Sequence, residues 1–450
     1  MGIAIKKCIM LTKKISLAAA TLFALVSSVA RAEVVLLDKD DWKFGMSGFV
    51  EFDGIGDSTS SFTEVVGNAA VKATGYDANV GRTQFSMRNS RFALNVLAPE
   101  NDGVKSRGYL EMDFLGYDPA PTDAFAGGAA NSEGSYYTNP TLRIRHAYMS
   151  STSGKSQLLV GQYWSLFGWQ PTYVLTTVSV APVSGTVYER TPQITYTYTT
   201  TSSENHQLVA AASVSRPNQR ASGLPNFEAG LKWSCSEKKS GFASANSDIK
   251  NVPMSVGLSG ALRDYTTPTN GADAVQTHHT ASAVAIDAQV PLITAKGDSP
   301  EGSLTLTAEY TTGEGYGDQF PSWGGTPALS NAAATPYSPN LDKGLAGYDS
   351  NLTFTLVKLD SANVQLQYHL AKGYFDVGYG LLHSSNASGL GASATTYDRA
   401  ESTFVNYFHN CTKQIRVGLE YAQFRTRYNN NGATSFATDT REMLATYYRF

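Results

Sequence analysis

Charged residues are scarce in this chain of 450 residues, because Asp, Glu, Lys and Arg together make up 16% of it. Soluble globular proteins usually reach about a quarter. The formal net charge is −3, so the chain has no basic excess of the kind that binds nucleic acid. Three cysteines are too few for a disulfide framework. The chain contains no long acidic, basic or proline-rich linker, so its length does not by itself indicate several domains.

Long apolar runs are absent after the first residues. The one clear run, ISLAAATLFALVSSV at positions 15–29, follows lysines at positions 6, 7, 13 and 14 and precedes Ala30-Arg31-Ala32. It is shorter than the ~20 residues of a membrane-spanning helix, and its layout is that of a secretory signal peptide. We therefore predict that residues 1–32 are cleaved and that the mature chain begins at Glu33. Cleavage leaves 30 basic and 38 acidic residues, a net charge of −8.

Apolar and polar residues alternate repeatedly along the mature chain. In residues 141–150, Leu142, Ile144 and Tyr148 have one parity, whereas Arg143 and Arg145 have the other. Residues 43–53, 107–116, 304–310 and 415–421 repeat the pattern. Successive side chains of a β-strand point to opposite faces, so the sequence predicts an all-β protein.

Two kinds of all-β protein fit this alternation. A soluble sandwich would bury the apolar faces, whereas a transmembrane antiparallel β-barrel would turn them toward lipid. Segments of about 9–13 residues suit a tilted membrane crossing and favour the barrel. Short links at 98–104, 152–155, 201–204, 371–373 and 410–413 also alternate with long ones at 54–80, 117–140, 165–190, 312–349 and 384–397. Counting from Trp42 predicts sixteen strands; an extra hairpin within residues 351–370 would make eighteen.

The chain ends inside such a segment, with the sequence EMLATYYRF at positions 442–450. A closed barrel pairs its last strand with its first, because unpaired backbone groups in hydrocarbon cost several kcal/mol each. We therefore expect residues 442–450 to form the closing strand, with Tyr448 and Phe450 at the periplasmic interface.

Several stretches carry a family resemblance. The terminal Phe450, after alternating aromatic residues, resembles the assembly signal of Gram-negative porins. SRFAL at 90–94, LRIRHAY at 142–148 and LLVGQYWSLF at 158–167 are similar to sequences of the trimeric DcaP-like porins, and the resemblance covers residues 42–450. Family members can carry a coiled-coil stretch before the barrel, but here only residues 33–41 are available, so we expect a short periplasmic segment.

The resemblance implies a homotrimer of sixteen-stranded barrels in the Gram-negative outer membrane. Its partners would be the lipid and lipopolysaccharide of that membrane and the outer-membrane assembly machinery. It also implies that the third long loop folds into the pore, a role that falls to residues 165–190. The residues themselves agree, because Val174, Leu175, Val178, Val180 and Val183 would be poorly soluble in water. The alternative is an ordinary surface loop.

Strand parity places charges of both signs on the inner wall. Arg91, Arg143 and Arg145 come from two strands that flank the one carrying Glu111 and Asp113. Within the third loop, the only carboxylate is Glu189, beside Arg190 at the end of the loop. A loop without acids that faces arginines should favour anions, since rings of charged side chains set the selectivity of pores. The predicted pore-lining residues are Arg91, Glu111, Asp113, Arg143, Arg145, Glu189 and Arg190.

The sequence thus predicts a porin that lets small hydrophilic solutes diffuse and favours anionic organic acids such as dicarboxylates. In a second interpretation the arginines only pair with Glu111 and Asp113, which leaves a weakly selective pore. A third is a structural or adhesive barrel that its own loops plug.

An enzyme on a barrel is the remaining class. It would need His together with Ser, Asp or Glu at one rim, and none of the seven histidines stands in a recognisable nucleophile motif. Adjacent His278 and His279 would point apart in a strand, which argues against a metal site. We expect neither enzymatic activity, nor a cofactor, nor a metal.

Overall fold

The computed structural model describes residues 34–67, 70–116, 140–178, 183–203, 205–268, 275–326, 341–351, 353–390, 396–430 and 433–450. The predicted signal peptide, residues 1–32, lies outside these described residues. Within them, no helix combines the length and the apolar character that a membrane crossing requires.

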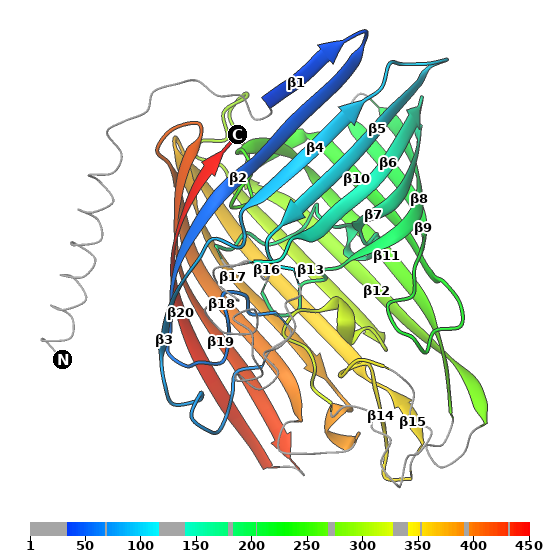
Figure 1. Ribbon diagram of the computed structural model, residues 1–450, viewed down its shortest axis with the longest axis vertical. Helices are drawn as coiled ribbons and strands as arrows, with labels where there is room; N and C mark the ends of the chain where they lie inside the picture. The colour runs from blue at the N-terminus through cyan, green and yellow to red at the C-terminus, as the bar shows by residue number, and fades with distance from the viewer. Residues whose placement is uncertain are drawn as a thin grey trace, which may run out of the picture. The chain divides into compact units, whose positions relative to one another are not determined.

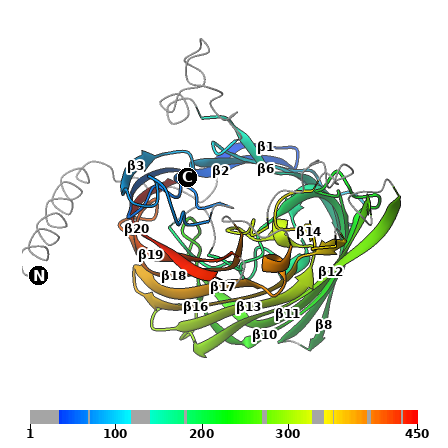
Figure 2. The ribbon, with the colours of Figure 1, turned by 90° about the horizontal axis from the view of Figure 1, so that it is seen from below.

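The described residues form a closed antiparallel barrel of sixteen strands, as predicted. Figure 1 shows the tilted strands side by side, and Figure 2 looks along the barrel onto the ring that they form. Its strands are β2 (Trp42–Asp57), β3 (Arg82–Ser86), β4 (Arg91–Leu97), β5 (Val104–Asp113), β6 (Arg143–Ser153), β7 (Ser156–Trp164), β8 (Arg190–Ser203), β9 (His206–Ser215), β10 (Asn226–Phe242), β11 (Lys250–Pro268), β12 (Gln276–Ile293), β13 (Leu304–Glu314), β16 (Lys358–Leu370), β17 (Gly373–Ser384), β18 (Tyr397–Asn410), β19 (Ile415–Asn430) and β20 (Ala433–Arg449).

Two features explain how these segments give sixteen crossings. β3 and β4 both pair with β2, one after the other, so they share a single crossing that is interrupted at residues 87–90. β14 (Ala346–Tyr348) and β15 (Phe354–Leu356) pair only with each other in a separate two-stranded sheet. Residues 351–370 therefore contribute one barrel strand, β16, and the eighteen-stranded alternative is wrong.

The alternation of side chains distinguishes the two faces of the wall. On β11, Val256, Leu258 and Leu262 are 43%, 49% and 52% exposed, while Ser255 and Ser259, which have the other parity, are 4% and 2% exposed. A soluble sandwich would show the opposite arrangement, with its apolar face buried. Apolar side chains outside and polar ones inside are the pattern of a membrane barrel around an aqueous lumen.

The barrel closes between its first and last strands. β2 pairs with β20 from Phe49↔Arg449 to Asp57↔Arg441. The terminal residue completes the ladder, because the N–H of Gly48 donates to the carbonyl of Phe450 (2.8 Å) and the N–H of Phe450 donates to that of Gly48 (3.0 Å). Residues 442–450 are thus the closing strand that the sequence predicted.

One strand precedes the point at which the sequence analysis began the barrel. β1 (Val34–Lys39) pairs with the first residues of β2 through a tight hairpin, from Val34↔Met46 to Lys39↔Trp42. Its side chains are exposed. β1 lies on the same side of β2 as β20 does, but beyond the end of β20, so it extends the sheet past the C-terminus and adds no crossing.

The connections differ at the two ends of the barrel. The short turns 98–103, 154–155 and 371–372 lie at the end that holds the C-terminus, whereas the longer connections after β2, β7 and β13 leave from the other end. Two connections at the C-terminal end are longer: residues 243–249 between β10 and β11, and residues 294–303 between β12 and β13. Most of residues 294–303 are exposed.

The closure generates a prediction about two glycines of β2. A Cβ at Gly48 would lie 2.2 Å from the carbonyl oxygen of Arg91, whereas one at Gly56 would meet nothing within 4 Å. We expect Gly48→Ala to destabilise the barrel by about 1–3 kcal/mol, the usual cost of overpacking, and Gly56→Ala to leave it unchanged. The folded fraction on semi-native gels, where a folded barrel migrates differently from the boiled chain, measures both. Equal folding of the two variants would contradict the close approach.

Candidate pore constriction

The described residues of the connection between β7 and β8, 165–178 and 183–189, run along the inner wall. Carboxylate Glu228 on β10 accepts from the N–H groups of Leu166 (2.8 Å) and Phe167 (3.2 Å) and from the hydroxyl of Ser165 (2.9 Å). Because Glu228 is itself buried on the inner face, these bonds hold the start of the connection inside the barrel.

Polar side chains of four other strands continue this support. The loop N–H groups donate from Gly168 to Ser259 Oγ (2.9 Å), from Thr176 to Gln365 Oε1 (2.5 Å), from Val178 to Glu420 Oε2 (2.6 Å) and from Ser184 to Ser402 Oγ (2.8 Å). The acceptors lie on β11, β16, β19 and β18. The loop therefore crosses the lumen and satisfies its backbone donors on the wall, as buried donors require.

The apolar residues of the loop are buried, too. Leu175, Val178 and Val183 are between 1% and 3% exposed. Leu175 and Val183 pack with Phe62 of the β2–β3 connection and with Phe424 of β19. Val180 lies outside the described residues. Packing of this kind explains why the loop can carry these side chains without presenting them to water.

Opposite the loop, five of the predicted residues form one connected ion-pair cluster on β4, β5 and β6. Arg145 donates to Glu111 Oε1 (2.7 Å) and to Asp113 Oδ2 (3.0 Å). Arg143 donates two hydrogen bonds to Asp113, one to Oδ1 (2.9 Å) and one to Oδ2 (2.6 Å). Arg91 Nη1 lies 3.6 Å from Glu111 Oε1. The members differ in exposure: Asp113 and Arg145 are almost fully buried, whereas the side chain of Arg143 is 34% exposed.

A β-bulge in β6 brings His146 to this cluster. Met112 pairs with Ile144 and its neighbour Glu111 pairs with His146, so Arg145 is the extra residue of the bulge. Arg145 and His146 are consecutive, yet both are buried, and His146 Nε2 lies 3.8 Å from Glu111. Bulges often re-aim side chains next to functional sites.

The bulge also inverts the faces of the rest of β6. Tyr148, which alternation placed on the lipid side, lies opposite Tyr109 across the β5–β6 pair, and the guanidinium of Arg107 is 6.0 Å from its ring. Met149 is the outward residue, at 62% exposure. The expectation for Tyr148 is therefore wrong, because one extra residue shifts the period of two.

Arg190 and Glu189 end the loop in different surroundings. The guanidinium of Arg190 stacks at 4.7 Å from the ring centre of Trp164 and 5.4 Å from that of Tyr188. Trp164 is also 5.9 Å from the guanidinium of Arg145, so Arg190 lies beside the ion-pair cluster. Glu189 instead pairs with Arg263 on β11 (3.4 Å), which also binds Asp318 at 2.6 Å. The structure thus separates Glu189 from the other predicted residues.

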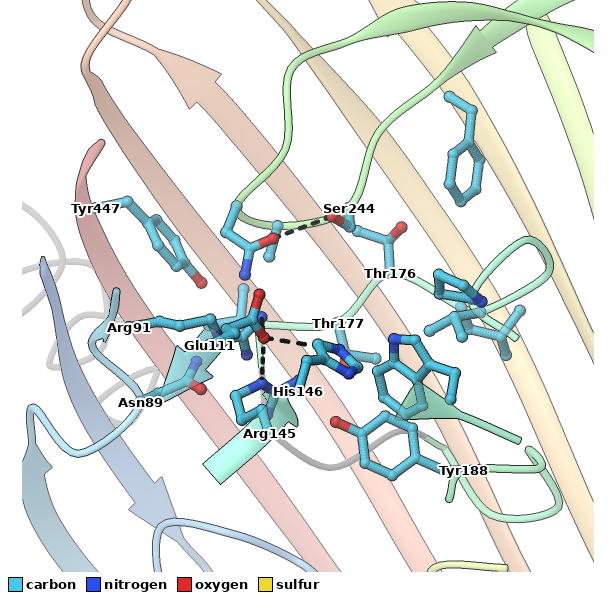
Figure 3. A pocket seen from close by; sticks show the side chains of 18 residues that line it. Asn89, Arg91, Glu111, Arg145, His146, Thr176, Thr177, Tyr188, Ser244 and Tyr447 are labelled. Atoms are coloured by element: carbon cyan, nitrogen blue, oxygen red, sulfur yellow. Dashed lines mark hydrogen bonds and ion pairs between the residues drawn. The ribbon is translucent and has the colours of Figure 1, made fainter. Parts of the chain in front are cut away.

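A cavity of about 320 Å³ lies between the cluster and the loop. In Figure 3, Arg91, Glu111, Arg145 and His146 stand on one side of it, and Thr176 and Ser244 stand on the other. Its described lining residues are Asn89, Arg91, Glu111, Arg145, His146, Trp164, Pro171, Val174, Leu175, Thr176, Thr177, Val178, Tyr188, Phe242, Ser244, Ala245, Asn246 and Tyr447. Among them, Glu111 is the sole carboxylate, against two arginines.

Sequence reasoning missed part of this lining. Asn89 lies in the interruption between β3 and β4 and donates to buried Glu51 (2.6 Å). Tyr447 has inward parity on β20, which alternation could have indicated. Residues 242–246 come from a connection at the C-terminal end of the barrel, and no local pattern indicates that this connection reaches the loop.

The two arginines of β6 provide a test of the cluster. Arg145→Gln would leave the buried carboxylates of Glu111 and Asp113 short of a cation, which costs about 3–5 kcal/mol. Arg143→Gln removes a partner of the same Asp113 whose side chain is about one-third exposed, so water can replace it and we expect a loss below about 1 kcal/mol. Denaturant midpoints of the refolded barrel in micelles measure both. Similar losses of stability for the two variants would show that the difference in burial does not determine how much each arginine contributes.

Comparisons with known proteins agree with this architecture. No protein-family model matches the sequence, and neither does any curated protein sequence. Among solved structures, the outer membrane channel DcaP of Acinetobacter baumannii is similar, with a TM-score of 0.63 and 17% identity over 93% of this chain and 100% of that one.

Two further structures are more distant. An anion-selective porin from Comamonas acidovorans has a TM-score of 0.54 and 11% identity, covering 91% of this chain and 100% of that one. OmpF of Salmonella typhi, in complex with daunomycin, has a TM-score of 0.51 and 11% identity, covering 92% and 99%. Together with the closed ring of sixteen strands, these likenesses show that the chain has the barrel fold of the outer-membrane porins.

Proposed function

We propose that the protein is a diffusion channel in the outer membrane of a Gram-negative bacterium and that it favours small anionic solutes. In this proposal residues 1–32 direct export and are removed, and residues 42–450 form the porin domain. The outer-membrane assembly machinery recognises the C-terminal Tyr448 and Phe450. Three copies of the chain associate among the lipid and lipopolysaccharide of that membrane. The fold supports the channel, since such barrels enclose an aqueous lumen.

The observation that carries the anion preference is the unequal lining of the constriction. Arg91 and Arg145 face the cavity, and Glu111 is the single carboxylate among its described lining residues. The segments on the other side, residues 174–178 and 244–246, are uncharged. Selectivity follows the charged groups at the narrowest point of a pore, so the surplus of guanidinium groups favours anions.

Arg91 is the arginine best suited to meet a passing solute. Its Nη1 lies 3.6 Å from Glu111, which is too long for a good hydrogen bond. The side chain of Arg91 is 18% exposed. Arginine binds carboxylates through two parallel bonds, so an organic acid in the cavity can approach the exposed part of this guanidinium group. A dicarboxylate can contact Arg91 with one end while its second carboxylate remains on the side of the cavity that Arg145 lines.

The similar solved structures support the same proposal. The protein from Acinetobacter baumannii is an outer membrane channel, and the one from Comamonas acidovorans is an anion-selective porin. Their likeness in fold favours a transport role for this chain, and the arginine-rich constriction supplies the argument for anions.

A weakly selective or plugged barrel is the competing function, and one observation favours it. Aromatic residues of the β13–β16 connection, among them Tyr316, Phe320 and Trp323, are at most 2% exposed and pack with Phe167 of the inner loop. The described residues of this connection therefore occupy part of the lumen. A filled lumen lowers the expected conductance, and the ion pairs of Glu111 and Asp113 reduce the charge that a solute meets.

Reversal potentials in a KCl gradient distinguish these possibilities. We expect chloride preference for the protein in planar bilayers and a shift toward potassium for Arg91→Gln, because that variant removes a lining charge without leaving a tightly bonded carboxylate. Lys155→Gln, in the exposed β6–β7 turn, removes the same charge away from the lumen and serves as the control. Cation preference of the unmodified channel would overturn the proposal, and a channel that never conducts would indicate a plug.

A second measurement addresses the kind of anion. We expect succinate to block the chloride current at lower concentration than acetate does, because two carboxylates can engage more than one guanidinium in the constriction. Arg91→Gln should remove most of the difference between the two acids. Equal block by succinate and acetate would leave anion preference in place and would refute the specificity for dicarboxylates.

A further inference from the structure

The hairpin between β10 and β11 departs from the barrel wall at its C-terminal end. Cys235 pairs with Met254 and Lys239 pairs with Pro253, so residues 236–238 form an insertion in β10. Beyond the insertion the pairing continues as far as Phe242↔Lys250. An insertion on one strand bends it and increases its twist, and here the distal part of the hairpin turns into the lumen.

Contacts with β13 and the connection before it establish the direction of the turn. The N–H of Gly241 donates to Ser303 Oγ (2.8 Å), and Thr305 donates to Ser240 Oγ (2.7 Å). Ser240, Ser303 and Thr305 are fully buried. The hairpin therefore lies against the inner face of strands that follow β12 around the ring.

The tip, residues 243–249, is held on the far side of the barrel. Arg416 of β19 donates to the carbonyls of Ser244 (2.9 Å) and Ala245 (2.8 Å). Arg449 of β20 pairs with Asp248 (3.0 Å). β11 and β20 are seven strands apart in a ring of sixteen, so the hairpin spans the lumen nearly from wall to wall.

The same tip contacts the inner loop. Thr176 donates its hydroxyl to the carbonyl of Ala243 (2.7 Å). Gln367 of β16 joins the two segments, because its amide bonds to the backbone of Ala243 at 2.8 and 2.9 Å and to Thr176 Oγ1 at 3.3 Å. Val178 packs in one apolar cluster with Ala243. The residues of the loop and the hairpin that line the cavity therefore form one continuous, uncharged wall opposite the arginines.

We infer that the tip of the β10–β11 hairpin is a second constriction element, which limits the size of the solute and provides polar contacts opposite Arg91 and Arg145. This inference rests on the proposed channel function. Ser244, Ala245 and Asn246 line the cavity. Ser244 donates to Asn246 Oδ1 (3.1 Å), which orients the amide so that its nitrogen can donate to an acceptor in the cavity. A neutral donor there binds a hydroxyl or a carboxylate oxygen without adding a charge.

Cysteine labelling tests the position of the tip without removing the hairpin. Asn246→Cys is made in a Cys411→Ser background, since Cys411 is exposed and Cys235 is buried. Lys155→Cys in the same background is the control, at an exposed turn of the same end of the barrel. We expect a methanethiosulfonate reagent to cause a stepwise loss of single-channel conductance for Asn246→Cys only. An unchanged conductance after complete labelling, verified by mass, would overturn the inference.

A shortened hairpin provides the second test. Phe242 and Lys250 are paired, so an Asn-Gly turn can replace residues 243–249 in the geometry of a two-residue hairpin. We expect higher conductance and passage of larger sugars in liposome swelling, whereas an unchanged size limit in a folded barrel would contradict the inference.

The two proposals can fail separately. If labelling of Asn246→Cys lowers a cation-selective current, the hairpin assignment stands and the anion proposal fails. If the current is anion-selective and labelling leaves it unchanged, the anion proposal stands and the hairpin assignment fails.

Discussion

The pairing of every backbone group is the constraint on which this structure depends. In hydrocarbon an unpaired N–H or carbonyl costs several kcal/mol, so a sheet can cross a membrane only when it closes. Here β2 pairs with β20 on one side and with β3 and β4 on the other, and the carbonyl and N–H of Phe450 bond to Gly48. Closure then forces alternate side chains outward and inward, and the inward polar side chains create the lumen.

Those inward side chains also determine where the inner segments lie. A connection inside the barrel must satisfy its own donors, and the wall offers acceptors such as Glu228, Gln365 and Glu420 along one path. The same requirement applies to the β10–β11 hairpin, whose backbone carbonyls accept hydrogen bonds from Arg416. The constriction is therefore assembled from three parts of the chain that lie far apart in the sequence.

Buried arginines have different roles within this wall. Arg145 is bonded to two carboxylates and holds β5 and β6 in register, while Arg91 keeps a buried donor without a partner among the described residues. Parity correctly grouped both with Glu111 and Asp113, because alternation holds as long as a strand is regular. It failed at Tyr148, since the bulge adds one residue. Nor could parity indicate that Glu189 pairs with Arg263, a residue some seventy positions later.

The sequence alone determined the class and the closing strand, and it narrowed the number of crossings to sixteen or eighteen. These properties follow from a local period of two and from the spacing of turns, which adjacent residues encode. Only the tertiary structure decided which face His146 adopts, where Glu189 finds its cation and how residues 243–249 reach β19 and β20. These outcomes depend on contacts between residues that lie far apart in the sequence. The local alternation of side chains does not predict such contacts.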